Sequence, residues 1–169
     1  MKQEEFVEHP LEPIWDEKAR VLILGSFPSV KTREQGFYYG HPRNRFWPLL
    51  SQLLRIEPPL SVADPARAAS CLRAHGIALW DILASCHIIG SGDSSIREAR
   101  PNQLEPRIAG SQIRRVFCNG RTAYMYYQKF QAAKLDLPYS LLPSTSPANA
   151  AWSPERLREA WQVILEDLP

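Results

Sequence analysis

The chain has 169 residues, 44% of them hydrophobic and 22% charged, which is the balance of a globular domain and not of a disordered segment. A formal net charge of +2 is too small to indicate a nucleic-acid partner by itself, and no apolar run approaches the roughly 20 residues that span a bilayer. We therefore expect one domain over residues 1–169 and no membrane partner.

The cysteines and the first residues indicate the compartment. Cys71, Cys86 and Cys118 are odd in number and widely spaced, so they fit neither a disulfide framework nor a CxxC metal pair. The opening residues MKQEEFVEHPLEPIWDE are acidic and lack the apolar region of an export signal. We expect reduced thiols in a cytoplasmic protein.

In the first half of the chain, two predicted strands flank two predicted helices. The runs at 21–24 and 77–83 are apolar without regular alternation, which is typical of strands in a parallel sheet covered on both faces. The apolar residues of 42–54 follow helical spacing. Asp64, a good cap followed by proline, predicts a second helix over 64–76.

The second half continues the alternation of strands and helices. Residues 90–110 form the longest stretch expected to be irregular, with one short helix near 103–108. The remaining elements are expected in the order strand, helix, strand, helix over 116–118, 121–134, 140–142 and 153–168. No internal repeat or linker interrupts this order.

This order predicts an α/β fold: a single three-layer domain with a four-stranded, mostly parallel central sheet flanked by helices on both faces. In such sheets, ligands bind outside the carboxyl ends of the strands. Conspicuous loops follow three of the four strands and are expected to converge on one cleft: GSFPSVKTREQGFYYGHPRN, ASCHIIGSGDSSI and PSTSPANAAWSP.

Each loop taken alone has two interpretations. The hydroxyls and backbone amides of LPSTSPANA suit a phosphate-binding loop or an ordinary turn before the last helix. Tyr38 and Tyr39 suit a stacking platform or a small local core. Asn44 suits a binding role or a helix cap. His41 has no second histidine or carboxylate at ligand spacing, so no metal site is expected.

Taken together, the segments GSFPS at 25–29, HPRNRFW at 41–47 and LPSTSPANA at 142–150 resemble one family. The chain is similar to members of the uracil-DNA glycosylase superfamily. Within it, the sequence is most similar to the hypoxanthine (deoxyinosine)-DNA glycosylases, near the mismatch-specific uracil and thymine glycosylases. The resemblance covers the chain from about residue 21 to the last helix.

The resemblance implies a DNA repair enzyme. Members of the family flip a damaged base out of double-stranded DNA and hydrolyse the N-glycosidic bond, which leaves an abasic site. Because the three motifs contain no lysine, a monofunctional enzyme is favoured over a strand-cutting lyase. The implied substrate is DNA with a deaminated base (hypoxanthine, uracil or both) or a mismatched one. Some relatives hold an iron–sulfur cluster on four cysteines, which three cysteines cannot reproduce, so no cofactor is expected. A monomer is the default for a chain of this size.

The resemblance also assigns site residues. Many relatives activate water with a polar residue just before the proline of the first loop, where this chain has Phe27. The asparagine of the HPRN segment, Asn44, is then the expected catalytic residue, with Asp93 in reserve. Tyr39 is expected to stack on the flipped base. The other implied pocket residues are Ser26, Phe27, Ser29 and His41, and the implied DNA contacts are Arg33, Arg43, Arg45, Ser144, Thr145, Ser146, Pro147, Ala148 and Asn149.

Two alternatives stay open on the sequence alone. Phe27 at the water-activating position is compatible with a DNA-binding module that recognises lesions without turnover. An N-glycosidase acting on free nucleosides is the second alternative. The local excess of basic residues between Lys31 and Arg55 favours a nucleic-acid polymer, although such a stretch also suits an ordinary solvated face.

Overall fold

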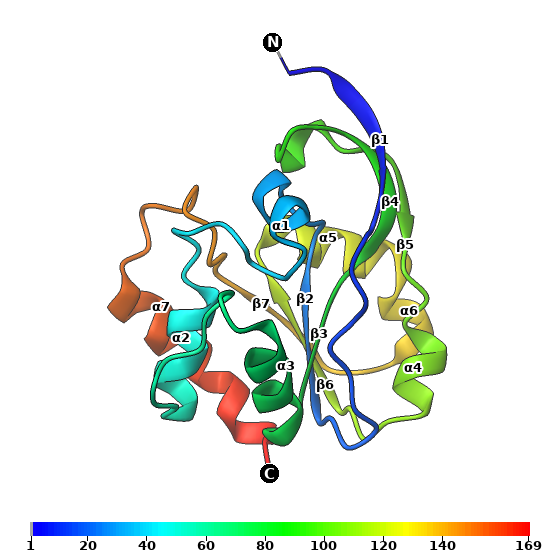
Figure 1. The fold of residues 1–169 in the computed structure, drawn as a ribbon. Helices are drawn as coiled ribbons and strands as arrows, with labels where there is room; N and C mark the ends of the chain where they lie inside the picture. The colour runs from blue at the N-terminus through cyan, green and yellow to red at the C-terminus, as the bar shows by residue number, and fades with distance from the viewer. Residues whose placement is uncertain (1) are drawn as a thin grey trace.

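The computed structural model of the protein describes residues 2–169 and contains two β-sheets (Figure 1). The larger one is four-stranded and parallel, with the strand order β3-β2-β6-β7. Its strands are Val21–Gly25 (β2), Ile77–Asp81 (β3), Arg115–Asn119 (β6) and Tyr139–Leu142 (β7). The four predicted strands are confirmed, and the two most buried, β2 and β3, are the ones with unbroken apolar runs.

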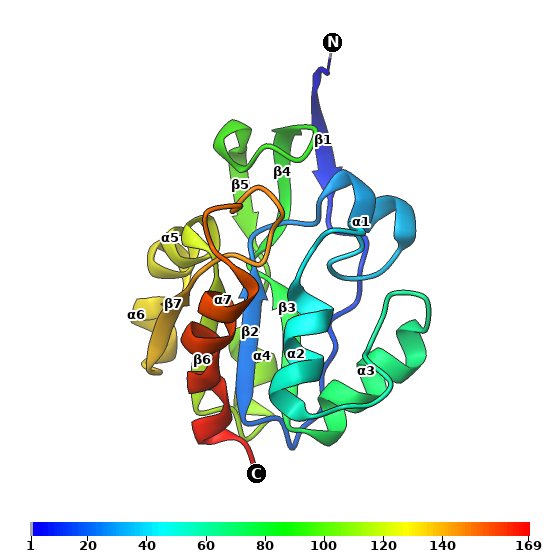
Figure 2. The same cartoon turned by 90° about the vertical axis from the view of Figure 1, so that its left-hand side faces the viewer.

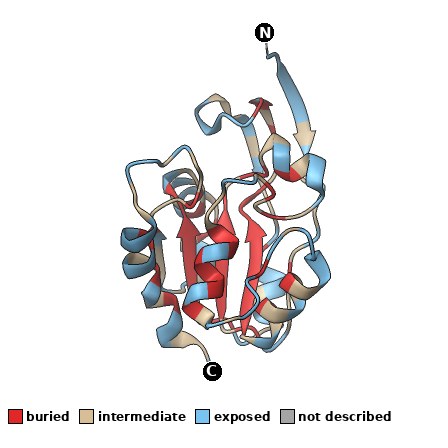
Figure 3. Ribbon diagram, turned by 60° about the vertical axis from the view of Figure 1, so that its left-hand side comes forward, coloured by how far each residue is buried: buried red, intermediate tan, exposed pale blue. Residues whose placement is uncertain are grey.

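Helices cover both faces of this sheet, which confirms the predicted three-layer α/β fold (Figures 1 and 2). One face carries α2 (Phe46–Leu54), α3 (Pro65–Ala74) and α7 (Pro154–Trp161). The other carries α4 (Glu105–Ala109), α5 (Arg121–Phe130) and α6 (Ala132–Leu135). The predicted cap is present, since the Asp64 side chain accepts a hydrogen bond from the backbone N–H of Arg67. The central strands form the buried middle layer in Figure 3.

A second, antiparallel sheet was not predicted. It has the order β1-β4-β5, from Glu4–Glu8 (β1), Leu83–Ile89 (β4) and Arg97–Pro101 (β5). The expectation that residues 90–110 are irregular was therefore wrong for β5, although the short helix is present as α4. The outer strands β1 and β5 are largely exposed, so pairing with β4 holds them and their sequences carry no apolar pattern.

The topology places a crevice at the carboxyl ends of β2 and β6. The connection from β2 to β3 passes over one face of the sheet, and the connection from β6 to β7 passes over the other (Figure 2). The chain therefore changes direction between β2 and β6, which is where open α/β sheets bind ligands. Between residues 2 and 169 no helix is both long and apolar enough to cross a membrane.

Candidate active site

A cavity of about 340 Å³ opens at this crevice. Three strand ends form its floor: Gly25 of β2, Asp81 of β3 and Asn119 of β6. The loops after β2, β4 and β7 supply its walls, so the predicted convergence of three loops on one cleft is confirmed. The cavity is within the size range of small-molecule pockets and large enough for one nucleobase.

The loop after β2 contributes Ser26, Phe27 and Ser29 to the cavity. Ser29 begins the short helix α1 (Val30–Gln35), because its Oγ accepts the backbone N–H of Thr32 at 3.1 Å. Phe27 is only 8% exposed. The polar group that many relatives carry at this position is thus replaced by a buried ring, which can neither orient nor deprotonate water.

Asn44 both accepts a hydrogen bond from the first residue of a helix and lines the cavity. Its Oδ1 accepts the backbone N–H of Phe46 at 2.9 Å, the first residue of α2. Its Nδ2 makes no hydrogen bond with any residue from 2 to 169. One lone pair of Oδ1 is therefore used within the fold, and the Nδ2–H groups are available as donors to a ligand.

Tyr39 lines the cavity, with its ring stacked on Phe46 at a centroid distance of 4.1 Å. Burial raises the pKa of the Tyr39 hydroxyl, and the nearby carboxylate of Asp81 raises it further. Tyr38 also borders the cavity, but its hydroxyl donates to the backbone carbonyl of Glu12 at 2.8 Å, which ties it to the core. Tyr38 thus belongs to the local core, and Tyr39 both packs on the core residue Phe46 and lines the cavity.

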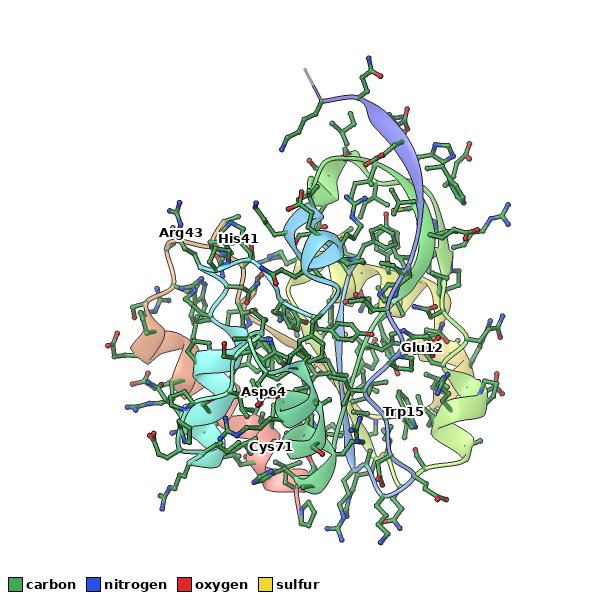
Figure 4. The ribbon with its side chains drawn as sticks, viewed as in Figure 1. Glu12, Trp15, His41, Arg43, Asp64 and Cys71 are labelled. Carbon is green, nitrogen blue, oxygen red and sulfur yellow. The ribbon has the colours of Figure 1, made fainter. Side chains whose placement is uncertain are left out.

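His41, expected in the base pocket, lies outside it. It is absent from the cavity lining, and its Nδ1 accepts the backbone N–H of Arg43 at 3.0 Å within its own turn. Figure 4 shows both residues at the outer tip of the loop that precedes α2. The backbone turns here, since the Asn44 N–H donates to the His41 carbonyl at 2.9 Å, and of these two residues only Asn44 lines the cavity.

Asp81 occupies the floor of the cavity and was not expected there. Its Oδ2 lies 2.7 Å from Nε2 of His9, and the two side chains are only 6% and 4% exposed. Gly25 approaches Asp81 so closely that a Cβ at position 25 would lie 2.4 Å from Oδ1. A glycine is therefore required at the end of β2 to leave room for this carboxylate.

Asp93 stands between this cavity and a second, adjoining one of about 580 Å³. Its carboxylate accepts a hydrogen bond from Oγ of Ser26, 3.1 and 3.2 Å from its two oxygens, which joins the loops after β2 and β4. Although the residue has an exposed side, the surrounding protein desolvates the carboxylate and raises the pKa of Asp93, and the charge of Asp81 acts in the same direction.

The loop after β7 is anchored by a reciprocal pair. Asn119 Nδ2 donates to Oγ1 of Thr145 at 3.1 Å, and Thr145 N–H donates to Oδ1 of Asn119 at 3.1 Å. Thr145 is fully buried, so the expectation that its hydroxyl contacts DNA is wrong for this arrangement. Its flanking residues Ser144 and Ser146 are partly exposed and line both cavities.

Arg45, the arginine of the NRFW motif, bonds to the loop that contains residues 147–149. Ala148 and Asn149 line the adjoining cavity. Arg45 donates from its guanidinium to the carbonyls of Ser146 at 2.9 Å and Asn149 at 3.0 Å, and to that of Trp152. Its role in the structure is to hold this loop.

The other two candidate arginines differ from each other. Arg33 donates to the carbonyl of Gly90 at 3.1 Å and approaches Glu5 at 3.4 Å, so its guanidinium is engaged with the second sheet. Arg43 is exposed and projects from the tip of its loop (Figure 4). Of the three, Arg43 has the position that suits a phosphate contact.

The sequence reasoning missed three site residues: His9, Asp81 and Asn119. A signal existed for Asp81, a single charge inside an apolar strand, and for Asn119, a polar residue at a strand end. His9 carried none, because it reaches the site only through long-range packing. Residues 2–169 contain no group of three or more histidine, cysteine or acidic side chains that could hold a metal.

Comparisons with known proteins agree with this geometry. The family model of the uracil DNA glycosylase superfamily matches residues 13–168. A protein of Methanosarcina acetivorans named hypoxanthine DNA glycosylase is 30% identical over 152 residues, which cover 89% of this chain and 93% of that protein. One of the same name from Methanosarcina barkeri is 30% identical over 138 residues, covering 81% and 85%.

A solution NMR structure of a candidate uracil DNA glycosylase from Methanosarcina acetivorans has a TM-score of 0.77 and 27% identity to this chain. The match covers 95% of this chain and 97% of that one. The resemblance seen in the three loop motifs is thereby confirmed over nearly the whole length. This chain belongs to the uracil DNA glycosylase superfamily.

Proposed function

We propose that this DNA glycosylase removes deaminated bases, with hypoxanthine as a principal substrate, from double-stranded DNA and leaves an abasic site. Two relatives of 30% identity carry the name hypoxanthine DNA glycosylase. The observation that carries the proposal is the pairing of two groups on one cavity: the free Nδ2 donor of Asn44 and the buried carboxylate of Asp81.

These two groups complement the edge that deamination creates. Hypoxanthine presents a C6 carbonyl acceptor beside an N1–H donor, and uracil presents the same pair at C4 and N3. Adenine presents the reverse, an N6–H donor beside an N1 lone pair. A donor at Asn44 and an acceptor at Asp81 fit the lactam edge, and adenine would leave the carboxylate facing a lone pair. An unpaired buried polar group costs about 1–3 kcal/mol, which is enough to discriminate.

In the proposed reaction the bond between the base nitrogen and C1′ of the sugar breaks, and its electron pair leaves with the base. The negative charge that develops on the base carbonyl is stabilised by the Asn44 Nδ2 donor. Water adds to C1′ of the oxocarbenium-like sugar and loses a proton to solvent, while the base anion takes up a proton from solvent. Asp93, at the mouth of the cavity, is the group we assign to positioning this water. Base flipping itself costs a few kcal/mol, least for a mispaired base.

The proposed DNA contacts surround the cavity mouth. Exposed Arg43 contacts a phosphate, and Ser144 and Ser146 bind the backbone beside the flipped nucleotide. The segment 147–149 fills the gap left in the duplex. The monomeric state and the cytoplasmic location expected from the sequence remain part of this proposal.

The test is single-turnover excision from labelled duplexes that contain hypoxanthine opposite thymine or uracil opposite guanine, with alkali to reveal abasic sites. We expect product from the wild type. Asn44→Asp keeps an acceptor for the Phe46 N–H but removes the donor, so its rate should fall about 10²- to 10³-fold with the fold retained. Near-normal excision by Asn44→Asp would contradict the role of Asn44.

The same assay separates the alternatives. Specific binding of lesion duplexes by the wild type without abasic product would indicate a non-catalytic module. Strong inhibition of duplex excision by free deoxyinosine would indicate an enzyme built for nucleosides. The family match and both named relatives favour the glycosylase over either alternative.

A further inference from the structure

The carboxylate on the pocket floor is held by a residue from outside the parallel sheet. His9 follows strand β1, and its Nε2 lies 2.7 Å from Oδ2 of Asp81, 72 residues away in the sequence. The family model matches residues 13–168, so His9 precedes the matched part of the chain. The pair thus joins the segment that follows β1 to the end of β3 in the parallel sheet.

His9 is itself fixed from several sides. Its Nδ1 lies 3.2 Å from the backbone nitrogen of Leu11 and 3.0 Å from the Leu11 carbonyl. Its ring packs edge-on against Phe27 at 6.0 Å and tilted against Tyr38 at 6.2 Å. A neutral ring accepts the Leu11 N–H at Nδ1 and donates from Nε2. A charged ring donates from both nitrogens, so Nε2 donates to Asp81 in either state.

The second oxygen of Asp81 is left for the pocket. Oδ1 makes no hydrogen bond with the described part of the chain, and the side chain lines the cavity. The backbone of Gly25 lies close to this oxygen, since a Cβ at position 25 would be 2.4 Å from Oδ1. Phe27, in place of the usual polar residue, covers the histidine. One carboxylate oxygen is therefore bound to His9, and the other has no hydrogen-bond partner among the described residues at a cavity that Asp81 lines.

We propose that His9 is a positioning residue for lesion recognition, which holds Asp81 so that Oδ1 accepts the N–H of the lactam edge. This inference rests on the proposed function, because it assumes that a lactam base occupies the cavity. Without the Nε2 donor, Oδ2 would be a buried carboxylate oxygen lacking a partner, and the side chain would be free to rotate away from the base. The N-terminal segment would then be part of the specificity apparatus.

A matched pair of variants tests the donor. His9→Gln places an amide N–H near the position of Nε2 and can still donate to Asp81. His9→Asn places its amide near the position of Nδ1, where it can keep the Leu11 contact but cannot reach Asp81. We expect single-turnover excision of hypoxanthine to fall about 10- to 100-fold for His9→Asn and to stay within about threefold of wild type for His9→Gln.

A double-mutant cycle separates positioning from a general effect on folding. Asp81→Asn preserves the size of the side chain and removes the charge. If His9 acts through Asp81, adding His9→Asn to Asp81→Asn should change the rate less than about twofold. Equal slowing by His9→Asn in both backgrounds would overturn the inference. Should His9→Asn fail to fold, His9→Met replaces it, since it fills the space beside Phe27 and Tyr38 without a donor.

The two proposals fail in different ways. Absence of excision of hypoxanthine and uracil by the wild type would overturn the proposed function and this inference with it. An active wild type together with full activity of His9→Asn, or of folded His9→Met, would overturn this inference alone. Loss of activity in folded His9→Gln comparable to that in His9→Asn would also overturn it, because donation to Asp81 would then be insufficient.

Discussion

Oδ1 of Asn44 accepts the backbone N–H of Phe46 at 2.9 Å, so the side chain proposed to bind the base also begins helix α2. Binding and folding thus use opposite ends of one amide. In the proposed function, the hydrogen bond to Phe46 orients the Nδ2 donor before DNA binds.

This dual use predicts that two substitutions of Asn44 differ in stability and agree in activity. Asn44→Ala removes the hydrogen bond to the Phe46 N–H and should lower the free energy of unfolding by about 1 kcal/mol, whereas Asn44→Asp retains an acceptor and should stay near wild type. Both should lose excision. Urea unfolding of the three proteins measures the first effect, and equal stability of Asn44→Ala and wild type would contradict it.

The ionised carboxylate of Asp93 should lower the free energy of unfolding. Desolvation raises the pKa of its carboxyl above the ordinary value, so the folded state binds the proton more tightly than the unfolded state. Its contribution to stability therefore falls as the pH rises from the ordinary range through the raised pKa. We predict that Asp93→Asn is more stable than wild type at pH 7, with the difference vanishing near pH 3, and that excision decreases.

Thermal unfolding at both pH values, with excision assayed in parallel, checks this prediction. Ser26→Ala serves as a control, because it removes the hydrogen bond to the carboxylate without removing the charge. If Asp93→Asn is less stable than wild type at pH 7, the carboxylate does not destabilise the fold. If the variant excises hypoxanthine at the wild-type rate, the carboxylate is not needed for excision. Either result would contradict the prediction.

The hydrogen bonds between Asn119 and Thr145 should stabilise the loop after β7. Thr145→Val removes Oγ1 and leaves the buried Nδ2 of Asn119 without an acceptor, which should cost about 1–3 kcal/mol of unfolding free energy. Thr145→Ser retains the hydroxyl and is the matched control. Urea titrations of both variants decide the point, and a valine variant as stable as the serine variant would show that the pair contributes little.

Substitution of Arg43 should affect DNA binding, whereas substitution of Arg45 should affect the stability of the loop after β7. Arg43 is exposed, so Arg43→Ala should weaken binding to any duplex, reduce the salt slope of the affinity by about 1, and leave stability unchanged. Arg45→Ala removes the bonds to the carbonyls of the 146–152 loop and should lower the unfolding temperature. Affinity measured at several salt concentrations and thermal unfolding of both variants provide the comparison.

The sequence predicted the parallel sheet and the main helices because their signals are local: unbroken apolar runs and caps such as Asp64. The second sheet escaped prediction because β1 and β5 are exposed and held by their partner β4. Among site residues, Asn44 and Tyr39 were found through the loop motif. The His9–Asp81 pair depends on the packing of segments 72 residues apart, for which no spacing rule exists.

The role of Arg45 could not be predicted for a similar reason. From the sequence, an arginine beside Asn44 suits a phosphate contact, since guanidinium groups usually remain in solvent. Its engagement with backbone carbonyls arises only when the loops after β2 and β7 meet. Thr145 is the middle one of three consecutive residues with hydroxyl groups, Ser144 to Ser146. Its burial could not be predicted from the sequence, because the burial depends on how the loop packs in the fold.

Strand β3 runs into β4 with only Ile82 between them, so the two sheets share a nearly continuous path of chain. The junction is pinned, because Ile82 N–H bonds to the Gly25 carbonyl at 2.8 Å and the Ile82 carbonyl accepts the N–H of Asn102 at 2.8 Å. The backbone beside Asp81 is therefore held by both sheets, so a displacement of either sheet would move the floor of the cavity.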